Sequence, residues 1–286
     1  QNEEGDYIIG GYTSGGIKIN NETISDNEGG VIIKLKESKK KELFKTDVLD
    51  SKVIEKTSEI TSIKETTDGG HIAVGSFDSS SIDLKNGVIV KNNGERDGLV
   101  IKYNEEGETE WAKAIGGNQG DFINSVSQTT DCGYIVGGYF ESECIDLGNG
   151  VTLNNNGNKD GMIIKYDSEG NIEWAKSIGG DRDEEVKSVA QTADGGCIVG
   201  GYFTSRSIDL GNGVTFNNRN SKDGMLIKYN AKGEIEWAKR IGGEYDVEIN
   251  SVAQTVDGGY IIGGHYNGYI DLGNGVKLSN VDALYY

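Results

Sequence analysis

The stretch DGMIIKYDSEGNIEWAKSIGG, residues 160–180, returns at a fixed interval along this chain of 286 residues. Its tryptophan, Trp174, has counterparts 63 residues before and after it, at Trp111 and Trp237. The short turn phrases built on Asp and Gly keep the same interval and begin at Asp68, Asp131, Asp194 and Asp257. A fixed period indicates stacked copies of one supersecondary unit.

One copy, residues 123–185, predicts four short strands. Residues 123–129 alternate apolar and polar side chains, and residues 134–140 are apolar on nearly every position. Residues 161–166 and 172–178 give two further strands, each bounded by Gly, Asn or Asp. Tight turns join the strands, so each copy is expected to form one antiparallel sheet with two apolar faces.

We therefore expect an all-β fold, a β-propeller of about five four-stranded blades that pack sheet against sheet. A linear β-solenoid is the alternative, but it usually has shorter repeats. The chain forms a single propeller domain or a fragment of a longer propeller. Its first expected strand, residues 5–12, and its last, residues 282–286, leave the two end blades partial. The expected repeats are residues 1–59, 60–122, 123–185, 186–248 and 249–286.

Each copy also carries an inserted hairpin between its second and third strands. Residues 145–153 contain Asn-Gly between apolar residues, a strong hairpin signal, and related segments stand at 82–90, 208–216 and 270–278. Glycine pairs such as Gly137-Gly138 lie inside the second strand, which suggests close approach of the neighbouring blade, against the repeated indole. The tryptophans are accordingly assigned to packing between blades rather than to sugar stacking.

Composition limits the partners and the class of protein. The net charge of −18 disfavours nucleic acid and anionic membrane surfaces. No run approaches the roughly 20 apolar residues of a membrane helix, so membrane insertion is not expected. Three cysteines without metal-type spacing give neither a disulfide framework nor a metal motif. The missing initiator methionine and signal peptide suggest a processed or excised segment.

The repeat resembles a bacterial β-propeller repeat family found in large secreted and surface proteins. The likeness lies in residues 160–166, in IEWAKSIGG at 172–180 and in SVAQT at 188–192, and it extends over nearly the whole chain. It implies a propeller and an extracellular or cell-surface location in bacteria. It implies no enzymatic activity and brings no catalytic residue.

The crossings from each fourth strand to the next blade are acidic and supply the candidate ligand-binding residues. The topology places these crossings on one rim with the inserted hairpins, where carboxylates could hold a hard cation such as Ca²⁺. Solvated loop acids are the favoured interpretation, because their positions shift between copies. The candidates are Asp121, Asp181, Asp183, Glu184, Glu244 and Asp246.

A second set of acids repeats more strictly. It stands at the hairpins and comprises the weaker Ca²⁺ candidates Asp83, Asp146, Asp209 and Asp271. The favoured role for these carboxylates is to accept backbone hydrogen bonds in the turn. The aspartates of the turn phrases, and those that open the third strand at Asp97, Asp160 and Asp223, are assigned to turns.

The sequence favours a non-enzymatic module that binds or adheres to a glycan or protein through the rim of hairpins and acidic loops. A purely structural spacer within a larger surface protein is the alternative, and a carbohydrate-active hydrolase or lyase is less favoured. The two histidines have no nucleophile at a suggestive spacing, and no pair of acids is singled out. We expect no cofactor beyond Ca²⁺.

Overall fold

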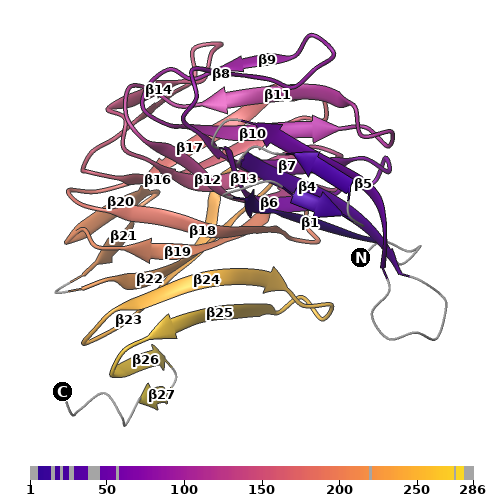
Figure 1. The fold of residues 1–286 in the computed structure, drawn as a ribbon. Helices are drawn as coiled ribbons and strands as arrows, with labels where there is room; N and C mark the ends of the chain where they lie inside the picture. The colour runs from indigo at the N-terminus through magenta and orange to yellow at the C-terminus, as the bar shows by residue number, and fades with distance from the viewer. Residues whose placement is uncertain are drawn as a thin grey trace, which may run out of the picture. The chain divides into compact units, whose positions relative to one another are not determined.

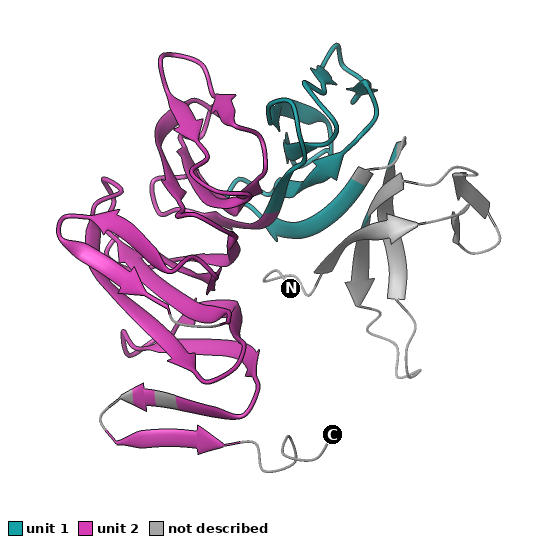
Figure 2. Cartoon of the chain, turned by 90° about the vertical axis from the view of Figure 1, so that its left-hand side faces the viewer, with its two compact units in different colours: residues 1–123 teal, residues 124–286 magenta. Residues whose placement is uncertain are grey.

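The structure, a computed structural model, describes residues 6–13, 17–19, 22–25, 29–37, 46–55, 58–218, 221–273 and 275–279. The regular elements of these residues are strands in antiparallel sheets, and none of them is a helix (Figure 1). The prediction of an all-β antiparallel fold is confirmed. The chain divides into two compact units, residues 1–123 and 124–286, coloured separately in Figure 2.

The third repeat forms a four-stranded sheet in the order β12-β13-β16-β17. These strands are β12 (Asp121–Gln128), β13 (Tyr134–Phe140), β16 (Asp160–Tyr166) and β17 (Ile172–Ile178). The two middle strands are almost wholly buried, as their apolar sequences require. The turn between β12 and β13 places Cys132 at φ 64°, where the next copy has Gly195 at φ 83°. Glycine adopts this left-handed backbone without steric cost, whereas the side chain of cysteine is strained there.

The fourth repeat has the same four-stranded arrangement, and the strands of the following hairpin, β26 (Tyr269–Gly273) and β27 (Val276–Ser279), extend this sheet beyond its fourth strand. The strands of the fourth repeat are β18 (Glu184–Gln191), β19 (Cys197–Phe203), β22 (Asp223–Tyr229) and β23 (Ile235–Gly243). Gly161 pairs with Ile178 in the third repeat and Gly224 with Ile241 in the fourth, so the register is the same. The 63-residue period of the sequence is therefore a period of strand pairing.

The first unit holds the first two repeats. The first repeat has a sheet β1-β4-β5 and a hairpin β2-β3, with β1 (Asp6–Thr13), β2 (Ile17–Ile19), β3 (Glu22–Ser25), β4 (Gly29–Glu37) and β5 (Thr46–Glu55). The second has a four-stranded sheet of β6 (Ser58–Glu65), β7 (His71–Phe77), β10 (Asp97–Tyr103) and β11 (Thr109–Ile115). Ile32 and Ile54 of the first sheet share one apolar core with Leu99 and Ile101 of the second.

The inserted hairpins form where the Asn-Gly signals predict them. They are β8 (Ser81–Asp83) with β9 (Ile89–Lys91), β14 (Cys144–Asp146) with β15 (Thr152–Asn154), β20 (Ser207–Gly211) with β21 (Val214–Asn217), and β26 (Tyr269–Gly273) with β27 (Val276–Ser279). Each hairpin in the second to fourth repeats buries one apolar residue per strand, such as Ile208 and Phe216, which belong to the core of the fourth sheet.

Within the second unit, successive sheets pack face to face. A Cβ atom on Gly137 would lie 2.6 Å from Val186 and Val189 of the next repeat, and one on Gly200 would lie 2.5 Å from Val252. The glycines therefore mark close approach of the neighbouring sheet, as predicted. The expected partner was wrong, because apolar side chains of the neighbouring inner strand, and not an indole, occupy the contact.

Serine hydroxyls link the inner strands of neighbouring repeats. The amide of Val189 donates to Ser125 Oγ at 3.1 Å, and 63 residues later the amide of Val252 donates to Ser188 Oγ at 3.2 Å. These bonds satisfy strand-edge donors that a free sheet would leave open. The repeating hydroxyl also fixes the stagger between neighbouring sheets.

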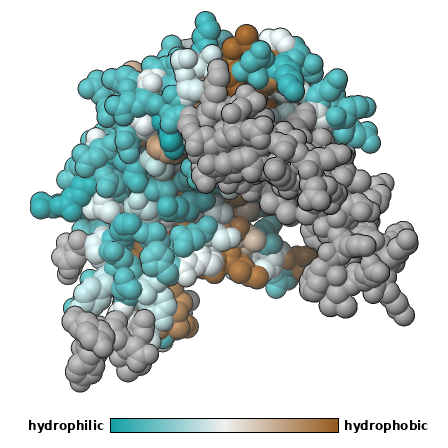
Figure 3. Space-filling model, in the orientation of Figure 1, coloured by the Kyte–Doolittle hydropathy of each residue, from teal (hydrophilic) through white to brown (hydrophobic). Residues whose placement is uncertain are grey.

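The fifth repeat contributes β24 (Val247–Gln254) and β25 (Tyr260–Tyr266) as a two-stranded sheet. Its β25 exposes residues whose counterparts in β7, β13 and β19 are buried, among them Ile261 at 62%. Residues 282–286, the expected third strand, lie outside the described residues. Elsewhere hydrophilic residues cover most of the described surface visible in Figure 3, in keeping with the net charge of −18.

Candidate functional site

Three segments of the second unit meet at one end of the strands. They are the loop before β16, the crossing from β17 to β18, and the residues after β19. The amide of Asn158 donates to the Arg182 carbonyl at 3.1 Å, and the amide of Thr204 donates to the Asp183 carbonyl at 2.9 Å. The loops that follow the hairpins and the crossings thus share a rim within this unit, as the strand order predicts.

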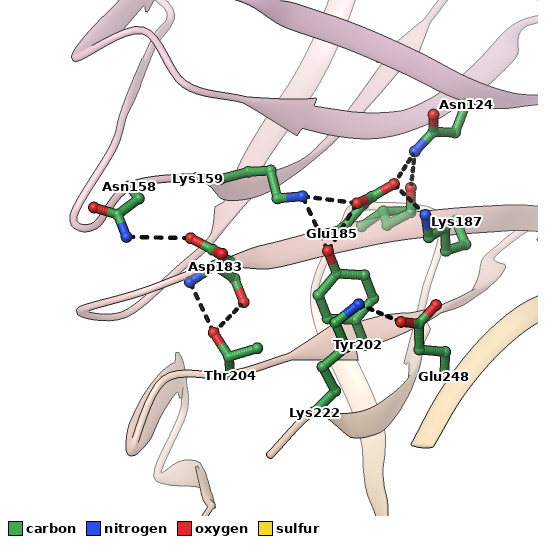
Figure 4. A network of polar contacts seen from close by, with 11 residues as sticks. Asn124, Asn158, Lys159, Asp183, Glu185, Lys187, Tyr202, Thr204, Lys222 and Glu248 are labelled. Carbon is green, nitrogen blue, oxygen red and sulfur yellow. Dashed lines mark hydrogen bonds and ion pairs between the residues drawn. The ribbon is translucent and has the colours of Figure 1, made fainter. Parts of the chain in front are cut away.

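Beside this rim lies a network that we name the lysine–glutamate cluster, shown in Figure 4. It comprises Lys159, Glu185, Lys187, Tyr202, Lys222 and Glu248. Its members come from the start of β16 and β22 and from β18, β19 and β24. Three consecutive repeats therefore contribute to one polar site.

Glu185 is the centre of the cluster, and its side chain is only 7% exposed. Lys159 Nζ lies 2.9 Å from its Oε2, and Tyr202 donates its hydroxyl to the same oxygen at 3.0 Å. Lys187 Nζ lies 2.6 Å from Oε1, which also accepts a hydrogen bond from Asn124. Both oxygens of this buried carboxylate are thus fully engaged, which removes the cost of its burial.

The second carboxylate of the cluster, Glu248, pairs with Lys222. Lys222 Nζ also lies 4.4 Å from the ring centre of Tyr202, and Lys159 Nζ lies 4.3 Å from the ring of Tyr139. At these distances each ammonium is attracted to the face of a ring. Lys222 and Lys187 keep about a third of their side chains exposed, so they can reach solutes.

The charges of the cluster fix its ionisation states. Burial alone would raise the pKa of Glu185, but the bonds and charges of Lys187 and Lys159 outweigh it and hold the pKa below its usual value. Burial and the charge of Glu185 raise the pKa of Tyr202. Burial likewise raises the pKa of Tyr139 to about 12. At neutral pH Glu185 is therefore a carboxylate, whereas Tyr202 and the adjacent Tyr139 are neutral phenols.

The cluster contains one ion pair twice, because Lys222 and Glu248 stand 63 residues after Lys159 and Glu185, whereas its other positions differ between copies. Glu185 corresponds to Phe122 in the preceding copy, where Arg96 stacks on the ring at 5.4 Å in place of an ion pair. Tyr202 corresponds to His265 in the following copy, and Lys187 corresponds to asparagine in both neighbours. The rim therefore keeps the lysine–glutamate pair in two successive copies and replaces it in the copy before them.

Two of the predicted ligand-binding acids do not lie at the surface. Asp121 and Glu184 are 0% exposed, so the interpretation as solvated loop acids is wrong for both. They begin β12 and β18, and their carboxylates accept the amides of Gly117 and Gly180 at 2.8 and 2.7 Å. The turn before each strand folds back on the acid, and this buries it.

The other four predicted acids lie on the rim. Asp181 accepts the amide of Arg206, and Asp183 accepts the side-chain amide of Asn158, each at 3.3 Å. Asp246 accepts the amide of Lys222 at 3.1 Å. Glu244 is exposed. Asp246 thus lies beside Lys222 of the cluster and, secondary to Glu248, helps to raise the pKa of this lysine.

The strictly repeated hairpin aspartates accept backbone amides. Asp83, Asp146 and Asp209 each accept the amide two residues later, at 2.8 to 2.9 Å. The side chain of Asp271 lies outside the description. In the described part of the chain, no three His, Cys, Asp or Glu side chains gather as a metal site would require.

Buried lysines are the main feature that the sequence reasoning missed. Lys165 is 3% exposed, and its Nζ lies 3.1 Å from Asp131, 2.9 Å from Glu173 and 3.0 Å from the Tyr166 carbonyl. Lys102 and Lys228 repeat this arrangement 63 residues away on either side. The available signal for these buried lysines was a lysine at the same position of an otherwise apolar strand in each copy. The turn aspartates thus have a second role as its counter-ions.

The predicted tryptophans contact the next repeat. Trp174 on β17 donates its Nε1 to the Ala231 carbonyl at 3.2 Å, and its ring lies 6.2 Å from that of Tyr229. Trp237 meets Tyr260 edge to face at 5.4 Å. Trp111 lies on β11 of the first unit and is half-buried. None of the three belongs to the lysine–glutamate cluster.

Comparison with known proteins gives two partial likenesses. The chain is 32% identical over 110 residues to the regulatory protein FlaEY of Caulobacter vibrioides, which covers 38% of this chain and 12% of that protein. It is 27% identical over 140 residues to an uncharacterized WD repeat-containing protein, L264, of Acanthamoeba polyphaga mimivirus, covering 46% and 10% respectively. The matches span only about a tenth of each relative. No family model matches the sequence.

The described residues contain no helix long and apolar enough to cross a bilayer.

Proposed function

We propose that this chain is a β-propeller repeat module without catalytic activity that binds a glycan through the rim around the lysine–glutamate cluster. Four-stranded antiparallel sheets at a 63-residue period, packed face to face within a unit, are the building plan of propeller blades. The likeness to a WD repeat-containing protein supports the same architecture. The resemblance to secreted repeat proteins favours a bacterial surface or extracellular location.

The observation that carries the proposal is the position of the cluster. Scaffold contacts such as the buried lysines recur unchanged from copy to copy. The cluster instead is confined to part of the chain: the pair Lys159–Glu185 recurs as Lys222–Glu248, but the preceding copy has Arg96 and Phe122 at these positions. In a repeat scaffold, function resides in the side chains that depart from the common pattern on a shared surface.

A glycan is the ligand class that fits the rim best. Sugar hydroxyl groups both donate and accept hydrogen bonds, and the rim offers both kinds of partner. Lys187 and Lys222 present partly exposed ammonium donors, and Asp181 and Glu244 present exposed carboxylate acceptors. Because strands hold the lysines and their counter-ions in place, little side-chain entropy is lost on binding.

A structural spacer is the second candidate, and the repeating serine bridges and buried lysines favour it. The absence of catalysis is proposed because the acids with the most perturbed pKa values are inaccessible. Asp97 and Asp160 are 0% exposed, so no substrate can reach them in the folded chain.

A glycan array with the full chain tests this proposal, followed by calorimetry on the best binder. We expect binding that weakens at least about tenfold in Lys222→Gln, since an ammonium contact is worth about 1.4 kcal/mol or more. Lys232→Gln is the matched control, because Lys232 is exposed at the opposite end of β22 and should bind unchanged. A blank array would favour the spacer, and equal losses in the two variants would place the ligand elsewhere.

A further inference from the structure

Two pairs of carboxyl groups are buried at equivalent places in successive repeats. Asp97 interacts with the charge of Asp121 in the first unit, and Asp160 interacts with that of Glu184 in the second. All four residues are 0% exposed. A Cβ atom on Gly116 would lie 2.3 Å from Asp97 Oδ1 and 2.9 Å from Asp121 Oδ2. The two carboxyl oxygens therefore approach the same position beside Gly116. Two negative charges this close in a buried place would repel strongly.

The first acid of each pair accepts its hydrogen bonds on one carboxyl oxygen, Oδ2. Asp160 Oδ2 accepts the backbone and side-chain amides of Asn156 at 3.1 and 3.2 Å, and Asp97 Oδ2 accepts the same groups of Asn93. Among the described residues, the Oδ1 atoms of Asp97 and Asp160 are buried and receive no hydrogen bond. A buried carboxylate oxygen without a donor is costly, whereas a protonated oxygen becomes a donor itself.

The second acid of the pair is built as an acceptor. Glu184 Oε2 accepts the amide of Gly180 at 2.7 Å, and Oε1 accepts the amides of Ser205 and Thr204 at 3.0 and 3.3 Å. Burial is the largest effect and raises the pKa of Glu184, but these N–H donors oppose it by stabilising the charged form. The pair therefore consists of one acid that lacks a donor and one carboxylate that is well supplied with them.

The fourth repeat shows what replaces the pair when the second acid is lost. Val247 stands at the position of Glu184, and Arg240 stands at that of Ser177. Arg240 Nε lies 2.6 Å from Asp223 Oδ2, the counterpart of Asp160. A guanidinium thus neutralises the first aspartate where no second acid is present. In the second and third repeats, the charged groups that act on Asp97 and Asp160 are instead the acids Asp121 and Glu184.

We propose that each buried pair shares one proton, carried on Oδ1 of Asp97 or Asp160 and donated to Asp121 or Glu184, and that the repeats are destabilised when this proton leaves. The proton occupies the place that the Arg240 guanidinium takes in the fourth repeat. No covalent bond other than the O–H bond changes. The shared protons therefore contribute stability in acid that is lost at alkaline pH.

The direction of the pH effect follows from the pKa values. Burial and then the charge of Glu184 raise the pKa of Asp160 from 3.8 to about 6, and burial and then Asp121 raise that of Asp97 to about 6. Each folded pKa lies above the unfolded one. The stabilisation is complete below about pH 4 and is lost as the pH rises through about 6. Two pKa units correspond to about 100-fold in the unfolding equilibrium for each pair.

Other charged groups near the pairs are engaged elsewhere. Lys159, which precedes Asp160, is bound to Glu185 and Tyr202. Arg96, which precedes Asp97, pairs with Asp78 and stacks on Phe122. The charged groups that act on Asp97 and Asp160 are therefore Asp121 and Glu184.

Two isosteric variants of one pair test the proposal by urea unfolding of the full chain at pH 5 and pH 8. Asp160→Asn installs a permanent donor, so we expect it to be more stable than the wild type at pH 8. Its unfolding equilibrium should change about tenfold less than that of the wild type between pH 5 and pH 8. Glu184→Gln loses the charge that three amides bind, so we expect lower stability at both pH values. The surface acids are the same in both variants, so their contribution to the pH dependence of unfolding cancels when the variants are compared.

A second test uses the wild-type chain and does not depend on the variants. Carbon-13 carboxyl shifts should show Asp160 titrating near pH 6 in the folded state, and a midpoint near 4 would overturn the proposal. Destabilisation of Asp160→Asn at pH 8 would also overturn it. So would stabilisation of the wild type by calcium chloride at pH 8 that is reversed by a chelator and absent in Asp160→Asn, because the occupant would then be a metal ion.

Discussion

At the scale of single residues, the buried lysines explain why the turn aspartates repeat so strictly. Burial alone would raise the pKa of Asp194, but Thr192, Lys228 and the Gly196 amide outweigh it and lower the pKa to about 2. Lys228 is 1% exposed, whereas Asp194 is 52% exposed. The ion pair thus joins a buried cation to acids that remain hydrated. Removing the cation and removing an acid are therefore not equivalent changes.

This asymmetry can be measured in the third repeat. Asp131→Ala removes an acceptor from buried Lys165 and from the Thr129 hydroxyl and Gly133 amide, so we expect a loss of about 1.5–3 kcal/mol in the free energy of unfolding. Lys165→Met fills the same space, and its freed acids can hydrate, so its loss should be under about 1 kcal/mol.

Urea unfolding gives both values. Asp257→Ala is the matched control, since Asp257 bonds to Thr255 and Gly259 in the same turn without a described lysine, and its loss should be smaller than that of Asp131→Ala. A methionine variant more damaging than Asp131→Ala would contradict this account of the turn.

At the scale of elements, the sequence allowed strands and hairpins to be located but not their partners. The Asn-Gly signals gave the hairpins, because turn geometry is local. The partner of Gly137 was assigned wrongly, because the stagger of two packed sheets depends on both repeats. The burial of Asp121 and Glu184 was missed for a related reason. A loop acid becomes buried only when the preceding turn folds over it.

The contact between Trp174 and the next repeat gives an element-level prediction. Gly233 has φ 74°, and a Cβ atom there would lie 2.7 Å from Trp174 Cδ2. Gly233→Ala should therefore cost about 2–3 kcal/mol, part from the backbone and part from the displaced ring. In a Trp174→Ala background only the backbone part, about 1–2 kcal/mol, should remain.

Gly213→Ala is the matched control for this double-mutant cycle. Gly213 has φ 78°, and nothing lies within 4 Å of its added Cβ, so it reports the backbone cost alone. If Gly233→Ala cost the same with and without the indole, Trp174 would not be the residue that fixes the turn.

At the scale of the whole molecule, the 63-residue period predicted the recurring antiparallel sheets, because repetition is visible without any knowledge of contacts. The lysine–glutamate cluster was not predicted, because it draws on three repeats. Glu185 and Glu248 were not among the candidate acids. Their lysine partners became recognisable once the strands placed them within hydrogen-bonding distance.

The proposed arrangement of the repeats about an axis is tested most directly by electron-spin distances between equivalent hairpin positions. Ile89, Thr152, Thr215 and Lys277 are exposed and occupy the same place in four successive hairpins. They can be labelled through introduced cysteines after Cys132→Gly and Cys144→Ser. A propeller of five to seven blades predicts that Ile89 and Lys277 are separated by roughly 1.6 to 2.3 times the distance between Ile89 and Thr152. A ratio of about three, with equal steps along a straight line, would contradict the propeller.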